Sequence, residues 1–177
     1  MRNAADLLAR YAAYHRDHRN IATHRVGVPM ILFALGVLLA RPAVALGSLT
    51  LTPAWVAFGL AAAWWLTRGS LAVGLAASGG TAALLLLAQG LGAIGTAAWL
   101  GWGLGLLLLG WLLQWLGHYY EGRKPALADD IAGLLIGPMF VAAEVLFAAG
   151  WKLELAREIE RRAGPKFIRD LALPATR

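Results

Sequence analysis

The chain has 177 residues, a length typical of a single domain. Hydrophobic residues make up 59% of it, charged residues make up 15%, and the mean hydropathy is +0.62. Soluble domains contain about 45–50% apolar and about 25% charged residues, so this composition argues against a soluble globular protein and against disorder. The chain has no cysteine, which excludes a disulfide scaffold, a cysteine-ligated metal site and a thiol nucleophile.

The formal net charge is +6, and basic residues cluster in 1–25 and 152–177. A basic, apolar chain suits either nucleic acid or a membrane surface. Between Arg68 and Glu121 there is no Asp, Glu, Lys or Arg, a stretch long enough for two bilayer-crossing helices of about 20 residues each. We therefore expect an integral membrane protein in contact with membrane lipid, with no nucleic-acid partner. Its spans must be helical, because lipid offers no partners to open backbone groups.

The segment 1–25 is expected to be amphipathic, and a membrane bundle is expected over 26–150. Four full spans are predicted in chain order, at about 26–40, 51–66, 71–88 and 96–116. In the last of these, Gly101 and Gly105 form a GxxxG step. This step would let another helix approach closely, or it reflects the small residues that are common in such helices.

A fifth apolar segment, 131–150, carries Gly137-Pro138 near its middle and Glu144 inside it. Basic ends favour the cytoplasmic side, so both termini should share one side, which requires an even number of crossings. We therefore predict that 131–150 is broken or re-entrant, with the break at Gly137-Pro138, because proline removes a donor and clashes with the preceding turn. A fifth full span with a kink is the alternative.

The stretch 151–177 alternates apolar and charged residues and is predicted to be a charged surface helix and tail, with the helix ended by Gly164-Pro165. The predicted fold is thus all-α. It is a single integral membrane domain over 1–177, with four full spans, a broken or re-entrant fifth segment and both termini on the same side. The Ala/Leu/Gly/Arg-rich composition favours a bacterial inner membrane with cytoplasmic termini. The oligomeric state stays open.

Histidines stand at both ends of the predicted bundle sequence. His15, His18 and His24 precede the first span, and His118 ends the fourth. After four crossings the chain returns to the face from which it entered, so His118 should lie on the same face as the other three. Imidazoles that meet at one interface are what a metal site needs. Amphipathic histidines that contact lipid phosphates are the alternative.

Spacing restricts how these side chains can meet. His15 and His24 are nine residues apart, about 2.5 turns, which places them on opposite faces of a straight helix. If both bind one metal, the chain must bend between them, and we expect the bend around Asn20. Glu144 is costly as an ionised carboxylate in an apolar segment and should have a partner or a metal. A structural acid bonded to a tyrosine or tryptophan is the alternative.

Three motifs, taken together, resemble the membrane-bound 2-hydroxy fatty acid dioxygenases, the family linked to odd-chain fatty acid formation from phytosphingosine. The first is segment 11–29, with Tyr14, His15, Asn20, His24, Gly27 and Pro29; the second is QWLGHYYEGRKPAL, with Gln114, Gly117, His118, Glu121, Pro125 and Ala126; the third is GPMFVAAE, with Gly137, Pro138, Phe140 and Glu144. His18 is not part of these motifs.

The resemblance implies an Fe(2+)-dependent dioxygenase that uses molecular oxygen to shorten long-chain 2-hydroxy fatty acids by one carbon, as in α-oxidation. It implies His15, His24 and His118 as the metal ligands. Glu121 and Glu144 then compete for a role as carboxylate ligand or as support for the ligands. Asn20 and Gln114 would orient ligands or hold the substrate carboxylate.

Two other functions stay open at this point. A small membrane transporter or lipid-binding protein would use Glu144 as a coupling group. A membrane hydrolase or a desaturase-like di-iron enzyme is the third possibility, although four histidines are few for a di-iron site with histidine boxes.

Overall fold

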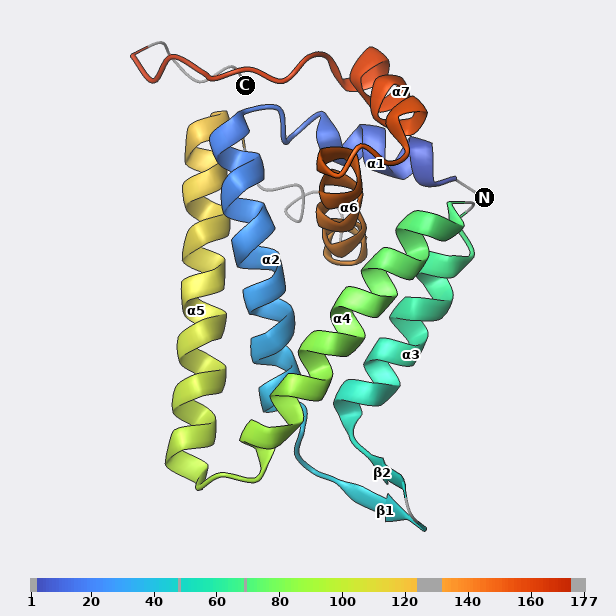
Figure 1. Ribbon diagram of the computed structural model, residues 1–177. Coiled ribbons are helices and arrows are strands. Elements are labelled where there is room, and N and C mark those ends of the chain that lie inside the picture. The colour runs from blue at the N-terminus through green and yellow to red at the C-terminus, as the bar shows by residue number, and fades with distance from the viewer. Residues whose placement is uncertain (1–2, 48, 69, 124–131, 173–177) are drawn as a thin grey trace.

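The computed structural model describes residues 3–47, 49–68, 70–123 and 132–172. The elements are α1 (Ala4–Ala12), α2 (His18–Leu38), β1 (Val44–Leu46), β2 (Leu49–Leu51), α3 (Pro53–Leu66), α4 (Leu71–Gly92), α5 (Thr96–Glu121), α6 (Gly133–Ala148) and α7 (Leu153–Ala163). The helices α2 to α5 run along the length of the molecule, while α1 and α7 lie across one end and the strands lie at the other (Figure 1). The described part of the chain is therefore mainly helical, as predicted.

Three helices, α2, α4 and α5, are long and apolar enough to cross a membrane. They contain 21, 22 and 26 residues, so each spans about 30 Å or more, the thickness of a bilayer's hydrocarbon core. The second predicted span corresponds to α3, which has only 14 residues and a length of about 21 Å. The structure thus supports three of the four predicted full spans by length and composition.

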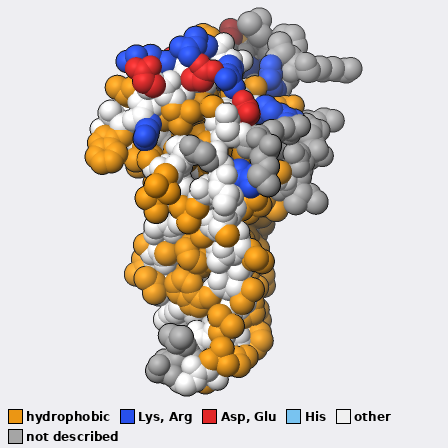
Figure 2. Space-filling model, turned by 90° about the vertical axis from the view of Figure 1, so that its right-hand side faces the viewer, with side chains coloured by type: hydrophobic (Ala, Val, Ile, Leu, Met, Phe, Trp, Pro, Cys, Tyr) orange, Lys and Arg blue, Asp and Glu red, His pale blue; other side chains and the backbone are white. Residues whose placement is uncertain are grey.

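The charged residues gather at the end of the molecule that carries α1 and α7. Figure 2 shows Lys, Arg, Asp and Glu side chains at this end and a mostly hydrophobic surface along the rest of the same face. An ion pair between Arg162 of α7 and Asp6 of α1 joins the two helices, with 2.7 Å between Nη1 and Oδ1. Helix α7 ends with Gly164 as its C-cap, as predicted.

The first long helix begins earlier than the sequence suggests, at His18 and not near residue 26. Asp17 is its N-cap and accepts a hydrogen bond from the backbone N–H of Arg19, which favours a helix start at this point. The expected bend around Asn20 is wrong, because Asn20 lies in the first turn of α2. The chain instead turns in the linker 13–17 between α1 and α2.

The predicted break at Gly137-Pro138 is also wrong, because α6 runs through Pro138 without interruption. The indole N–H of Trp65 donates to the carbonyl oxygen of Leu135 (2.8 Å), which ties α3 to the turn of α6 that precedes Pro138. The break follows Ala148 instead, where Gly150 has a positive φ of 79°. At this point α6 and α7 form a helix pair bent by 120°. The break therefore lies later in the chain than the predicted position at Gly137-Pro138.

A two-stranded antiparallel hairpin joins α2 to α3, with Val44 opposite Leu51. The all-α prediction did not include it. The hairpin lies at the end of the bundle away from α1 and α7 (Figure 1).

Glycines allow α2 and α5 to pack closely, although they are not the glycines of the GxxxG step. A Cβ at Gly110 would lie 2.6 Å from Ile31 Cγ1, and one at Gly117 would overlap Thr23 Oγ1 and Asn20 Oδ1. Among the described residues, nothing lies within 4 Å of a Cβ built on Gly101 or Gly105. The close contact therefore occurs near the histidine end of α5 and along its α2-facing side.

The variant Gly117→Ala should push α5 away from α2 next to His24 and lower stability by about 1–3 kcal/mol, the usual cost of overpacking. Thermal unfolding in detergent measures this effect. Gly105→Ala is the matched control on the same helix and should not lower the unfolding temperature, because its Cβ meets open space and alanine favours the helix. Equal unfolding temperatures for the two variants would contradict the close packing at Gly117.

Candidate metal centre and its cavity

Three histidines from separate parts of the chain meet at the charged end of the bundle. His15 lies in the linker 13–17, His24 lies in α2 and His118 lies near the end of α5. They are 0%, 2% and 6% exposed, and one ring nitrogen of each lies within 4.8 Å of the others. The expected convergence of the two distant histidine segments is therefore found. His18 is exposed and lies outside the cluster.

Hydrogen bonds to backbone carbonyls orient two of these rings. The Nδ1 atom of His15 lies 2.7 Å from the carbonyl oxygen of Tyr11, and Nδ1 of His24 lies 3.0 Å from that of Asn20. A carbonyl only accepts, so each Nδ1 carries the proton and donates it, and each neutral ring keeps its lone pair on Nε2. Those two Nε2 atoms face each other at 3.1 Å.

This arrangement fits a metal ion. Two lone pairs at 3.1 Å repel each other unless a cation lies between them. Metal–nitrogen bonds of about 2.0–2.1 Å would bring two imidazole nitrogens about this close, and histidine ligands usually donate their other N–H to a carbonyl or carboxylate. In addition, Nδ1 of His118 is buried without a hydrogen-bond partner in the described part of the chain.

Burial keeps the centre in the form that binds metal. Desolvation, followed by the proximity of His24 and His118, holds the pKa of His15 well below its usual value. The ring is therefore neutral near pH 7, and a neutral imidazole is the metal-binding form.

Glu121 holds the linker that carries His15. Its carboxylate accepts the backbone N–H groups of Arg16 (2.9 and 3.0 Å) and Asp17 (2.8 Å) and the side-chain amide of Asn20 (3.0 Å). Both carboxylate oxygens are thus engaged by the protein. The same Asn20 provides the carbonyl that orients His24, so Glu121 and Asn20 connect the supports of two histidines.

Glu144 lies in a different environment. It is buried and accepts hydrogen bonds from Lys166 Nζ (2.6 Å) and Arg25 Nη2 (3.1 Å). The expected partner of this costly carboxylate is thus a pair of cations and not a tyrosine or tryptophan. Among the described residues, the group of side chains able to share one ion contains only the three histidines.

Residues 164–170, here called the C-terminal strap, cross the outer side of the histidine linker. Phe167 donates its N–H to the carbonyl of Arg16 and accepts the N–H of His18, both at 3.0 Å. The backbone N–H of Arg169 donates to Asp17 Oδ2 (2.8 Å). Burial alone would raise the pKa of Asp17, but hydrogen bonds from Arg19 and Arg169 outweigh it and lower the pKa to about 2. The linker is consequently held between Glu121 and the strap.

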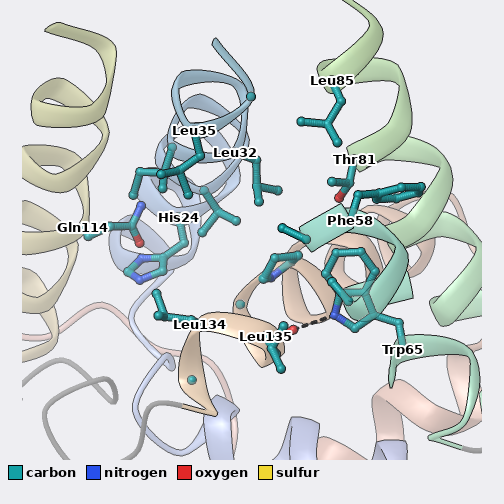
Figure 3. A pocket seen from close by; sticks show the side chains of 18 of the residues that line it. His24, Leu32, Leu35, Phe58, Trp65, Thr81, Leu85, Gln114, Leu134 and Leu135 are labelled. Carbon is teal, nitrogen blue, oxygen red and sulfur yellow. Dashed lines mark hydrogen bonds between the residues drawn. The ribbon is translucent and has the colours of Figure 1, made fainter. Parts of the chain in front are cut away.

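A cavity of about 290 Å³ leads from the histidines into the apolar bundle. His24, His118, Gln114 and Tyr11 line its polar end, and one face of α2 continues it to Leu39. Figure 3 shows Gln114 and His24 near each other, with Leu32 and Leu35 of α2 alongside. The amide Nε2 of Gln114 is buried and has no hydrogen-bond partner among the described residues, so this residue of the cavity lining carries an unpaired donor.

Tyr11 belongs to this site although the sequence assigned it no role. Its ring stacks on His15, with 4.1 Å between centroids and an interplanar angle of 6°. The four-residue spacing between Tyr11 and His15 was the available signal, since residues at that spacing share a helix face. The motif residues Pro125 and Ala126 lie outside the described part of the chain.

The fold and the site together define a helical protein with membrane-length apolar helices and a buried three-histidine centre that opens into an apolar cavity. The chain belongs to the family described as "2-hydroxy-palmitic acid dioxygenase Mpo1-like", whose sequence model matches residues 1–149. It is 32% identical over 156 residues to a protein of Saccharomyces cerevisiae named 2-hydroxy-palmitic acid dioxygenase MPO1, covering 85% of this chain and 83% of that protein. No solved structure gives a significant match.

Proposed function

We propose that this protein is an Fe(2+)-dependent dioxygenase that shortens long-chain 2-hydroxy fatty acids by one carbon, with His15, His24 and His118 as metal ligands. The observation that carries the proposal is the pair of Nε2 lone pairs from His15 and His24, which face each other at 3.1 Å beside His118. Imidazole suits iron, zinc, copper and nickel, and the dioxygenase name of the yeast relative favours iron. Iron(II) would supply the one-electron chemistry by which dioxygen reacts with an organic substrate.

The chain's own residues would bind and orient the substrate. The cavity-lining face of α2 extends from His24 to Leu39, about 22 Å of helix, whereas one bilayer leaflet is about 15 Å thick in its hydrocarbon part. A single long acyl chain fits this apolar length with its polar head at the histidines. The unpartnered Nε2 of Gln114 would then donate a hydrogen bond to the substrate carboxylate.

Glu121 and Asn20 act as positioning residues in this proposal. Glu121 fixes the linker bearing His15, and the backbone carbonyl of Asn20 accepts a hydrogen bond from Nδ1 of His24. Neither residue needs to touch the substrate, because Glu121 holds the backbone that carries His15 and the Asn20 carbonyl accepts a hydrogen bond from Nδ1 of His24. Glu144 lies with Arg25 and Lys166 and is not among the residues that line the cavity, so no observation favours its use as a transporter's coupling group.

The direct test loads the purified protein with iron(II) without oxygen, adds 2-hydroxypalmitic acid and then admits oxygen. The expected product is the fatty acid one carbon shorter, detected by mass spectrometry. Metal analysis of the same sample should give about one iron per chain. Recovery of unchanged substrate from iron-loaded protein would contradict the proposal, and two metals per chain would replace the mononuclear centre with a di-iron one.

We further propose that both termini lie on the cytoplasmic side of a bacterial inner membrane, with α3 as a short fourth crossing. Helix α3 runs from the hairpin end to the histidine end, where the carbonyl of Arg68 accepts the N–H of Ala4. The chain thus traverses the bundle four times before His118. Reporter tags at the two ends should give the same side of the membrane, and opposite sides would overturn the four-crossing arrangement.

A further inference from the structure

A tyrosine hydroxyl without a hydrogen-bond partner among the described residues belongs to the lining of the cavity. Tyr11 lines the cavity, and a Cβ built on Gly137 would lie 3.3 Å from its hydroxyl oxygen. Within the described residues, no hydrogen-bond partner is found for this hydroxyl. The hydroxyl oxygen is not fully enclosed by protein atoms, so a ligand or water in the cavity can complete its hydrogen bonding.

The Tyr11 side chain is held firmly in this position. Its ring stacks on His15 and contacts Phe140 at 5.1 Å between centroids. The backbone carbonyl of Tyr11 accepts a hydrogen bond from Nδ1 of His15. Tyr11 therefore has a fixed side-chain position, and its backbone carbonyl also orients the ring of His15.

Two side chains of the cavity lining, Tyr11 and Gln114, thus carry polar groups without a hydrogen-bond partner among the described residues. The Nε2 of Gln114 can only donate, which suits a carboxylate, whereas a phenol hydroxyl can both donate and accept, which suits another hydroxyl. We propose that the Tyr11 hydroxyl forms a hydrogen bond with the 2-hydroxyl of the substrate, an inference that rests on the proposed function. This bond makes Tyr11 a determinant of the preference for 2-hydroxylated over unsubstituted fatty acids, because a site built around a substrate hydroxyl disfavours the analogue that lacks it.

The test compares binding of 2-hydroxypalmitate and palmitate to the full-length, iron-loaded protein under argon, where no turnover occurs. Wild-type protein should bind 2-hydroxypalmitate more tightly. Tyr11→Phe removes only the hydroxyl and should lower the affinity ratio about fivefold, the worth of one neutral hydrogen bond, with unchanged palmitate affinity and iron content. Tyr119→Phe is the control, because Tyr119 is 63% exposed, and it should keep the wild-type ratio.

A second variant crowds the same hydroxyl and leaves the tyrosine itself unchanged. Gly137→Ala places a methyl group 3.3 Å from the hydroxyl oxygen, and the ratio should fall in the same direction by a smaller factor. If the phenylalanine variant weakens both acids equally or keeps the wild-type ratio, Tyr11 does not read the 2-hydroxyl. If wild-type protein itself binds the two acids equally, this inference is overturned, whereas the proposed function is decided separately by formation of the shortened acid.

Discussion

The variants His24→Ala and His118→Ala should each abolish stoichiometric metal binding while the protein stays inserted in the membrane. Each removes one of three nitrogen donors that lie within 4.8 Å of one another, and the two remaining imidazoles hold a divalent ion far more weakly. The two residues lie on different helices, α2 and α5, so equal losses would show that one ion depends on both. Metal content per chain, measured by elemental analysis after gel filtration, gives the result.

His18→Ala is the matched control for these variants. His18 is exposed and its side chain lies outside the cluster, so metal content should stay at the wild-type level. A loss equal to that of His24→Ala would show that the ligand set is wrong. Full metal content in His118→Ala would separate α5 from the centre and leave only the histidines near the N-terminus.

The meeting of distant histidines could be predicted from the sequence because it depends only on the number of crossings. An even number of traverses returns His118 to the face that holds His15 and His24, whatever the detailed packing of the bundle. The structure retains this result even though α3 is shorter than the expected span and a hairpin precedes it. The number of crossings stays the same even when the predicted ends of individual helices are wrong.

Local geometry near the site was predicted less well, because tertiary contacts decide it. Hydropathy places the start of the first span where charges end, but α2 begins at His18, where Asp17 caps the helix. Asp17 is itself held by Arg19 and by the backbone N–H of Arg169, far along the chain. The spacing of residues within 1–25 cannot predict that residues 164–170 cover this linker.

The role of Pro138 illustrates the same limit. Proline weakens a helix in isolation, so a break at Gly137-Pro138 was the expected outcome. In the structure, Trp65 of α3 donates to Leu135 of α6, and the helix continues to Ala148. The proline removes the N–H that would bond the carbonyl of Leu134, yet α6 continues with α3 bonded to this turn, a contact that the local sequence does not reveal.

The choice between Glu121 and Glu144 as the carboxylate of the site also depended on tertiary structure. In sequence, both follow motif residues and both stand next to apolar stretches. In the structure, Glu121 lies against the linker that bears His15, whereas Glu144 is paired with Arg25 and Lys166. The carboxylate that supports the metal centre is therefore expected to be Glu121.

Glu121→Gln should weaken metal binding about 10–100-fold, the usual range for residues that orient metal ligands. The glutamine amide has one oxygen to accept hydrogen bonds, whereas the carboxylate uses both oxygens for the N–H groups of Arg16, Asp17 and Asn20. An amide oxygen at the Oε2 position still accepts from all three donors, but the NH₂ group then takes the Oε1 position and faces the backbone N–H of Arg16 as a second donor. The linker would shift, and His15 would move with it.

Metal titration of detergent-purified protein measures this effect, and Glu154→Gln serves as the control because Glu154 is exposed and pairs with the exposed Arg157. The control should keep wild-type metal affinity. If Glu121→Gln keeps it as well, the hydrogen bonds to the linker do not position His15. If instead the variant loses all metal as His24→Ala does, Glu121 acts as a ligand in the metal-bound protein, since loss of support alone leaves three imidazoles able to bind at higher metal concentration.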